Sequence, residues 1–167
     1  MSDPTALPNF NTQPADGGGT EPAAEAPLRD RVQEALTELG LEPSVDDEGD
    51  LAFVFSEQQM FIRCSDDESN VLRVFGQWAL EDPVPTDPVE RLQVSNDLNV
   101  AFNLVKAAVA GDTLLVTSEH VLPRGADVRG LIGLALPLVL QGVQLWHQRA
   151  TGQESEGAGA EGGEPQA

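Results

Sequence analysis

The chain has 167 residues, of which 40% are hydrophobic, and its 28 acidic side chains outnumber its 9 basic ones, for a formal net charge of −19 at pH 7. This length and apolar content suit a single domain with its own core. Such an acidic chain repels phosphate backbones and anionic lipid surfaces, which argues against nucleic-acid binding and against binding to a membrane.

Both ends of the chain differ in composition from its middle. Residues 1–26 and residues 150–167 are rich in Gly, Pro, Ala and Glu, carry acidic side chains without any Lys or Arg, and show no hydrophobic period. Segments of this kind bury too little apolar area to offset the entropy of ordering them. We therefore predict disordered acidic tails at 1–26 and 150–167, on either side of one domain at 27–149.

The first part of the domain predicts a helix followed by three strands. Residues 28–39 place their apolar side chains on one narrow face, after Pro27 and before Gly40, as in a surface helix. The stretches 51–55, 60–64 and 71–78 are rich in β-branched and aromatic residues between polar turns, which is typical of an antiparallel meander. Neither face of the 51–55 strand is strongly polar. The acidic residues 46–50 lack the ligand spacing of a calcium loop, so we predict a hairpin turn there.

A second helix is predicted to begin after Asp87, a good N-cap, with Pro88 at its first helical position. It carries two apolar stripes on nearly opposite sides: Val89, Leu92 and Val100 on one, and Val94, Leu98 and Ala101 on the other. A helix with two apolar sides usually contacts two surfaces. One of them should be the sheet, and the other could be a symmetric copy of the same helix.

The remaining elements are a hairpin and a long closing helix. Residues 102–110 and 113–122 form the hairpin across Gly111 and Asp112, and Asp127 caps the helix that runs to Arg149. The polar positions of this helix form one narrow stripe: Gly130, Gly133, Pro137, Gln141, Gln144 and Gln148. The rest of its circumference is apolar, which is more than one sheet face can cover.

Residues 130–146 of this last helix contain no charged side chain, which raises the question of a membrane span. The uncharged stretch is at the lower length limit for a span and includes Gln141 and Gln144. We therefore predict a buried helix of a soluble protein. The element order α-β-β-β-α-β-β-α then predicts an α+β domain, with an antiparallel five-stranded sheet packed by helices.

Residues that could carry chemistry are few. His120 and His147 are far apart in sequence, Cys64 is the single cysteine, and neither a clustered metal-ligand set nor a nucleophile elbow nor a phosphate-binding glycine loop is present. We predict no catalytic residue, no metal and no cofactor, and hence a protein that is not an enzyme. The single cysteine and the lack of a signal-peptide pattern favour the cytoplasm.

Asn96 and Asn99 fall close to an apolar face of the second helix, where polar side chains need partners. They could bond to the strand that follows the helix. Alternatively they could order a dimer contact, as a buried asparagine fixes the register of paired helices.

Four segments carry a resemblance to a known family. They are the acidic turn and strand start Asp47–Leu51, the helical segment Leu92–Asn103 with its Asn-Asp-Leu-Asn core, the hairpin around Gly111 with Leu114–Val116, and the closing apolar helix. In these the chain, over residues 28–149, resembles the YbjN-domain family, whose fold is similar to that of the class I type III secretion chaperones. The resemblance implies a small acidic homodimer that binds peptide segments of other proteins on apolar surface.

We therefore predict a non-enzymatic protein- or peptide-binding module, chaperone-like or adaptor-like, that acts as a homodimer on an unidentified client. The surface expected for the dimer or the client comprises Val94, Leu98, Ala101, Leu136, Leu140 and Trp146, with Asn96 and Asn99 as polar register residues. A second hypothesis is a sensory or regulatory domain that binds a small ligand between the last helix and the sheet.

Overall fold

The computed structural model describes residues 25–65 and 70–153, so nearly all of both predicted tails lies outside the described residues. The elements, in chain order, are α1 (Leu28–Glu38), β1 (Ser44–Val45), β2 (Leu51–Phe55), β3 (Gln58–Cys64), β4 (Val71–Ala79), α2 (Pro88–Ala101), β5 (Lys106–Ala110), β6 (Thr113–Val121) and α3 (Val128–Ala150).

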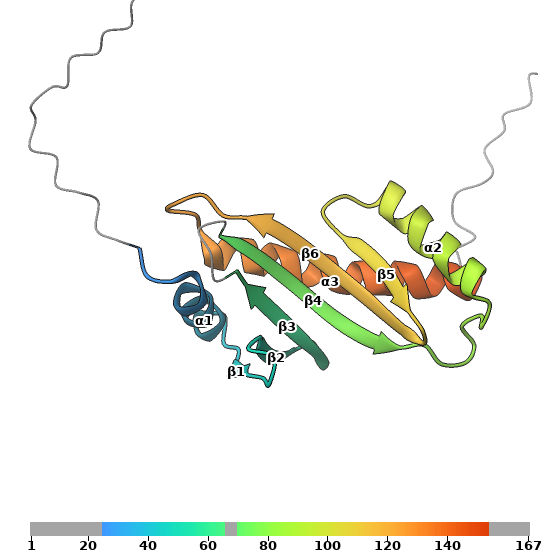
Figure 1. Cartoon of the computed structure of the whole chain (residues 1–167), viewed down its shortest axis with the longest axis horizontal. Coiled ribbons are helices and arrows are strands. Elements are labelled where there is room, and N and C mark those ends of the chain that lie inside the picture. Colours follow the sequence, from blue (N-terminus) through green and yellow to red (C-terminus); the bar gives the residue numbers. More distant parts are fainter. Residues whose placement is uncertain (1–24, 66–69, 154–167) are drawn as a thin grey trace, which may run out of the picture.

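The predicted α+β class with one antiparallel sheet is confirmed, but the sheet has six strands where five were predicted. The strand order is β1-β2-β3-β4-β6-β5, because α2 carries the chain from β4 to the far edge and β6 then returns between β4 and β5. α3 lies behind this sheet in Figure 1, and none of the described elements lies in front of it. The sheet therefore has one covered face and one open face.

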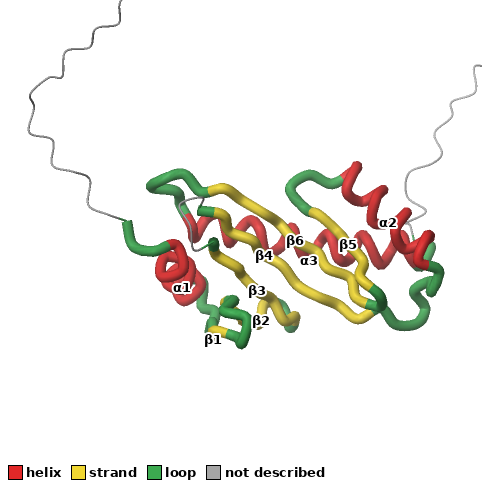
Figure 2. Tube along the Cα trace, in the orientation of Figure 1, coloured by secondary structure: helices red, strands yellow, loops and turns green. Residues whose placement is uncertain are grey.

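The hydrophobic core lies between the covered face of the sheet and the three helices. Side chains that alternate along β4 and β6, such as Leu72, Val74 and Val116, point toward α3 and are buried. α3 comes very close at Gly142, where an added Cβ would lie 2.9 Å from Val105 Cγ1 and 3.2 Å from Val116 Cγ1. α1 packs against α3, while α2 packs against both β5 and α3 (Figure 2).

The strands differ from the prediction at three places, each for a local reason: one strand was not predicted, and two begin at other residues than predicted. β1 is only two residues long, too short to recognise, and it pairs with β2 across the acidic turn at 46–50. β3 begins at Gln58, because Ser56 and Glu57 both adopt positive φ angles and make a two-residue hairpin turn. β5 begins at Lys106 instead of 102, because Leu104 has a φ of +66° and interrupts the extended chain.

The closing helix agrees closely with its prediction. The Asp127 carboxylate accepts a hydrogen bond from the Gly130 amide at 2.9 Å, and every residue of the predicted polar stripe is exposed. Among the described residues, α3 is the helix long and apolar enough to cross a membrane by length and composition, a test that a core helix also passes. Here its other side is buried against the sheet, so it belongs to the core of the domain.

Candidate functional site

The open face of the sheet carries apolar and aromatic side chains from four strands. We call it the sheet face and define it by six outward-pointing side chains on β2, β3, β4 and β6: Val54, Phe61, Phe75, Leu115, Thr117 and Val121. None of these residues was predicted as a site from the sequence. The sequence does carry one sign of an apolar outer face: strands such as 60–64 have apolar residues at neighbouring positions, and therefore on both faces.

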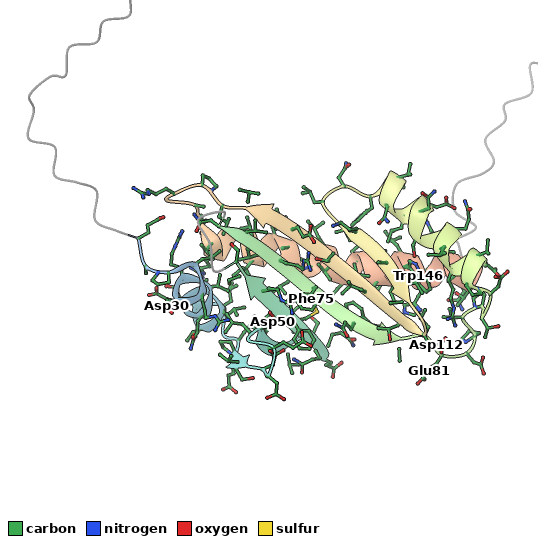
Figure 3. All side chains as sticks on the ribbon, viewed as in Figure 1. Asp30, Asp50, Phe75, Glu81, Asp112 and Trp146 are labelled. Carbon is green, nitrogen blue, oxygen red and sulfur yellow. The ribbon has the colours of Figure 1, made fainter. Side chains whose placement is uncertain are left out.

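An aromatic pair lies at the centre of the sheet face. Phe61 and Phe75 are direct partners in the β3–β4 register, and their rings stack with centroids 5.3 Å apart. The guanidinium of Arg63 lies 5.8 Å from the Phe75 ring centroid, and Phe75 itself is only 6% exposed. Figure 3 labels Phe75 in the middle of this open face.

Next to the aromatic pair is a polar group that lacks a partner. Thr117 is opposite Phe75 in the β4–β6 register and is 4% exposed. Its hydroxyl oxygen is buried and has no hydrogen-bond partner among the described residues. Leaving such a group unsatisfied costs on the order of 1–3 kcal/mol.

The cations of the sheet face are neutralised by carboxylates within the protein. Arg63 donates to both carboxylate oxygens of the buried Asp50, at 2.8 and 2.6 Å, and this pairing raises the pKa of Arg63 above its usual value. Arg73 and Lys106 both pair with Glu119, at 2.7 and 3.0 Å. The hydrogen bond from Lys106 is the main cause that lowers the pKa of Glu119. The face is therefore close to neutral in a chain of charge −19.

A second apolar surface lies on the outer side of α2. We call Val89, Leu92, Asn96 and Val100 the helix stripe, since they follow one another at spacings of three, four and four residues. Val89, Leu92 and Val100 are 71%, 56% and 81% exposed. Apolar side chains so exposed, with one asparagine among them, are typical of a helix that pairs with another helix.

The inner side of α2 is buried although two of its residues are polar. The Arg91 guanidinium donates to the carbonyl of Pro85, to the carbonyl of Gly111 at 3.2 Å and to the carboxylate of Asp112 at 2.8 Å. These bonds tie the start of α2 to the β5–β6 turn. Because the polar groups of Arg91 are satisfied, its side chain can be buried without a large desolvation penalty.

The third turn of α2 is tied to the closing helix. Trp146, fully buried on α3, donates its indole N–H to the Ser95 hydroxyl at 2.9 Å, and that hydroxyl donates to the carbonyl of Arg91 at 3.0 Å. Leu98, one turn on, is also fully buried. The α2 side that faces inward is therefore the side carrying Leu98, and the helix stripe faces solvent.

The residues predicted for the dimer or client surface are split by the structure. Leu98, Leu136 and Trp146 are buried in the core of the protomer, since they pack between α2, α3 and the sheet. Val94 and Leu140 are half-buried, and only Ala101 is exposed. These six residues do not form one accessible surface.

The two asparagines have different surroundings. Asn99 accepts from the Ala107 amide at 2.7 Å and donates to the Ala107 carbonyl at 3.0 Å, which satisfies the outer edge of β5 at this residue. This confirms the interpretation that Asn99 bonds to the following strand. Asn96 is exposed in the middle of the helix stripe, where its side-chain amide donates to the neighbouring Asp97 carboxylate at 3.5 Å.

A cavity of about 460 Å³ opens between α3 and the sheet, close to the β2–β3 turn. It is lined by Ser56, Gln58, Trp78, Leu140, Val143, Gln144, His147 and Gln148. Leu140 is the one predicted surface residue that lines it. The cavity occupies the place where the second hypothesis expected a small ligand.

Neither histidine is part of a cluster of His, Cys, Asp and Glu that could hold a metal ion, among the described residues. His120 shares a 2.8 Å hydrogen bond with the Ser118 hydroxyl, and the ring of His147 meets the Trp146 ring edge-on at 5.4 Å. Burial lowers the pKa of both histidines below the usual value. Both are therefore neutral at pH 7.

Comparison with protein families identifies this domain. Residues 26–125 match the TY-Chap1 family, described as T3SS (YopN, CesT) and YbjN peptide-binding chaperone 1. The chain belongs to this family. The match confirms the resemblance inferred from the sequence and describes a peptide-binding, chaperone-like module. It ends at Gly125, so α3 lies beyond the matched residues. A comparison with curated proteins gives no match.

Solved structures resemble this chain in fold. An uncharacterised protein from Methanothermobacter thermautotrophicus aligns with a TM-score of 0.51 and 13% identity over 74% of this chain and 99% of its own. The HopA1–SchA chaperone–effector complex aligns with a TM-score of 0.51 and 14% identity over 72% and 92%. YbjN from E. coli gives a TM-score of 0.48 and 16% identity over 74% and 89%. At these identities the likeness shows the fold alone.

Proposed function

We propose that this protein is a non-enzymatic, cytoplasmic chaperone-like module that holds an extended segment of another protein against its sheet face. The single observation that carries the proposal is this open face, whose stacked Phe61–Phe75 pair lies beside a buried hydroxyl that lacks a partner. Membership of a peptide-binding family supports it. The single cysteine of the chain, Cys64, supports the cytoplasm.

The chemistry of the sheet face indicates the kind of client segment that fits it. Apolar side chains of the segment would cover Phe61 and Leu115, which are both half-buried on this face. The face is neutral but the remaining surface is strongly acidic, so lysine or arginine at the ends of the segment would favour association and carboxylates would oppose it.

We also propose that two copies pair through the helix stripe. The stripe repeats at helix-pairing intervals, it is exposed in the protomer, and α2 runs along the outside of the sheet where a second copy has access (Figure 1). Asn96 would then lie at the centre of the contact and fix its register by bonding to its symmetric counterpart. Asn99 has no part in this contact, because its amide already satisfies Ala107.

Binding of labelled peptides by fluorescence anisotropy tests the client site. The peptides are about 15 residues long, enough to cross the sheet at ~3.3 Å per residue, with an apolar centre and either lysine or glutamate at the ends. We expect the lysine-flanked peptides to bind and Leu115→Glu to weaken them by roughly tenfold or more, because a buried leucine contact is worth about 1.5–3 kcal/mol.

Leu134→Glu is the matched control, since Leu134 is an exposed leucine on α3, away from the sheet face. Equal weakening by both variants would point to a general charge effect and count against the sheet face as the site. The melting temperature of each variant, followed by circular dichroism, shows whether the fold is retained.

The small-ligand hypothesis has one observation in its favour, the cavity under α3. A regulatory ligand there would be enclosed by α3 and the end of β4. A free small molecule in this cavity and a client side chain in it are distinguished by the titration described below.

A further inference from the structure

The cavity arises because two neighbouring strands diverge. β3 and β4 are paired from Cys64–Leu72 to Phe61–Phe75, but β3 begins at Gln58 and β4 continues to Ala79. Residues 76–79 of β4 pair with β6 alone among the described strands. The space left by this divergence is closed on one side by α3, and the cavity lies there, on the opposite side of the sheet from the sheet face.

One wall of the cavity is the indole of Trp78, which is held in a fixed position. Its N–H donates to the Gln58 side-chain oxygen at 2.9 Å, across the gap between the diverging strands. The ring also lies over Gly76, where an added Cβ would come within 2.4 Å of Trp78 Cη2. A glycine at this position therefore leaves the space that the indole occupies beside β4, where the indole forms part of the cavity wall.

Among the described residues, those that line the cavity include no charged side chain, although the chain as a whole has a charge of −19. Its polar lining consists of Ser56 and three glutamines together with His147, which is neutral at pH 7 because burial lowers its pKa. A charged group entering this space would lose its hydration and gain no ion pair. An uncharged ring would instead stack on Trp78 and contact Leu140 and Val143.

Polar groups at the mouth of the cavity remain available to a ligand. The side chains of Gln144, His147 and Gln148, which lie about one turn of α3 apart at most, make no hydrogen bond to the protein among the described residues. They could bond to a hydroxyl on the ring or to the amides on either side of it. The volume of about 460 Å³ falls within the ~300–1,000 Å³ typical of ligand sites.

We infer that this cavity binds the uncharged aromatic side chain of a client segment, stacked on Trp78 and bonded by the polar residues of α3. The inference rests on the proposed peptide-binding function, and it adds a second anchor that is separate from the sheet face. A client segment whose aromatic residue reaches the cavity behind the sheet would therefore bind more tightly than a segment that has apolar residues but no aromatic one.

Nuclear magnetic resonance of the two indole N–H groups tests this directly. The chain has two tryptophans, Trp78 in the cavity wall and Trp146, which is fully buried, bonded to Ser95 and in ring contact with His147. The full chain is titrated with the capped pentapeptide Gly-Gly-Tyr-Gly-Gly and, separately, with the same peptide carrying alanine in place of tyrosine. We expect the tyrosine peptide to move the Trp78 signal to saturation and the Trp146 signal by less, while the alanine peptide moves neither.

Two substitutions on the same face of α3 provide the matched variants. Gln144→Phe fills the cavity from its wall and is expected to weaken the tyrosine peptide by about tenfold. Gln141→Phe, one turn earlier, is exposed and does not line the cavity, so it should leave the titration unchanged. Both positions are exposed and lie in the polar stripe, so neither substitution should prevent folding.

Three results would overturn the inference. The first is a Trp78 signal that does not move with the tyrosine peptide, and the second is a Trp78 signal that moves equally with the alanine peptide. The third is a Trp78 signal that responds to free phenol or indole but not to the tyrosine peptide, which would favour a small ligand. If any of these occurs while the longer peptides still bind and are weakened by Leu115→Glu, the proposed function stands without this anchor. If no peptide of either length binds, the proposed function itself fails.

Discussion

Replacing Trp146 with alanine is expected to lower the free energy of unfolding by about 3–5 kcal/mol, a large part of the ~5–15 kcal/mol available to a domain. Trp146 is fully buried, so its removal leaves a large cavity between α2, α3 and the sheet. It also removes the hydrogen bond that joins α3 to Ser95 on α2. Chemical denaturation followed by far-ultraviolet circular dichroism measures the change.

Ser95→Ala separates the packing of Trp146 from its hydrogen bond. The substitution keeps the ring but leaves the buried indole N–H unpaired, so we expect a loss of about 1–3 kcal/mol, smaller than that of Trp146→Ala. This variant also provides the test if Trp146→Ala does not fold at all. A loss below about 1 kcal/mol for Trp146→Ala would contradict the packing described here, because it would mean that the ring is not part of the core.

Leu92→Glu is expected to convert the proposed dimer into a monomer. In a two-fold contact through the helix stripe, each copy loses the burial of one leucine and the two new carboxylates face each other. At about 1.5–3 kcal/mol per leucine, the dissociation constant should rise by roughly 100-fold or more. Size-exclusion chromatography with light scattering should give twice the 17.8 kDa chain mass for the natural protein and the chain mass for the variant.

Leu134→Glu is again the control, because Leu92 and Leu134 are each 56% exposed. It should leave the dimer intact. Asn96→Asp would place two like charges at the centre of the same contact and should also dissociate it, whereas Asn96→Ala should weaken its register without removing apolar surface. A natural protein that is monomeric at all concentrations would refute the proposed pairing.

The sequence predicted the elements of this fold well where local chemistry decides the structure. Asp87 and Asp127 both cap the helices that they were predicted to start, and the polar stripe of α3 is exposed throughout. These features depend on residues close together in the chain. The conformations of Ser56, Glu57 and Leu104 are also local, but their positive φ angles are unusual for such residues and leave no clear signal in the sequence.

The candidate surfaces were harder to predict because they depend on long-range contacts. Arg91 and Ser95 look like surface residues in the sequence, yet their groups bond to the β5–β6 turn and to Trp146, so the side of α2 that carries them turns inward with Leu98. The helix stripe, on the other side of α2, is consequently exposed to solvent. Phe61 and Phe75 form the centre of the sheet face because β3 and β4 pair in one particular register. That register could not be read from the pattern of residues in the two strands.

Locating a bound peptide on the protein directly tests whether the sheet face holds the client. In methyl-labelled full-length protein titrated with the lysine-flanked peptide that binds best, we expect shifts at Val54, Leu115 and Val121 on the sheet face. The methyl signals of Leu134 on α3 and of Val89 on the helix stripe should not move. Shifts confined to Leu134 or Val89, or no shift with any peptide, would contradict the claim that the open face of the sheet holds the client.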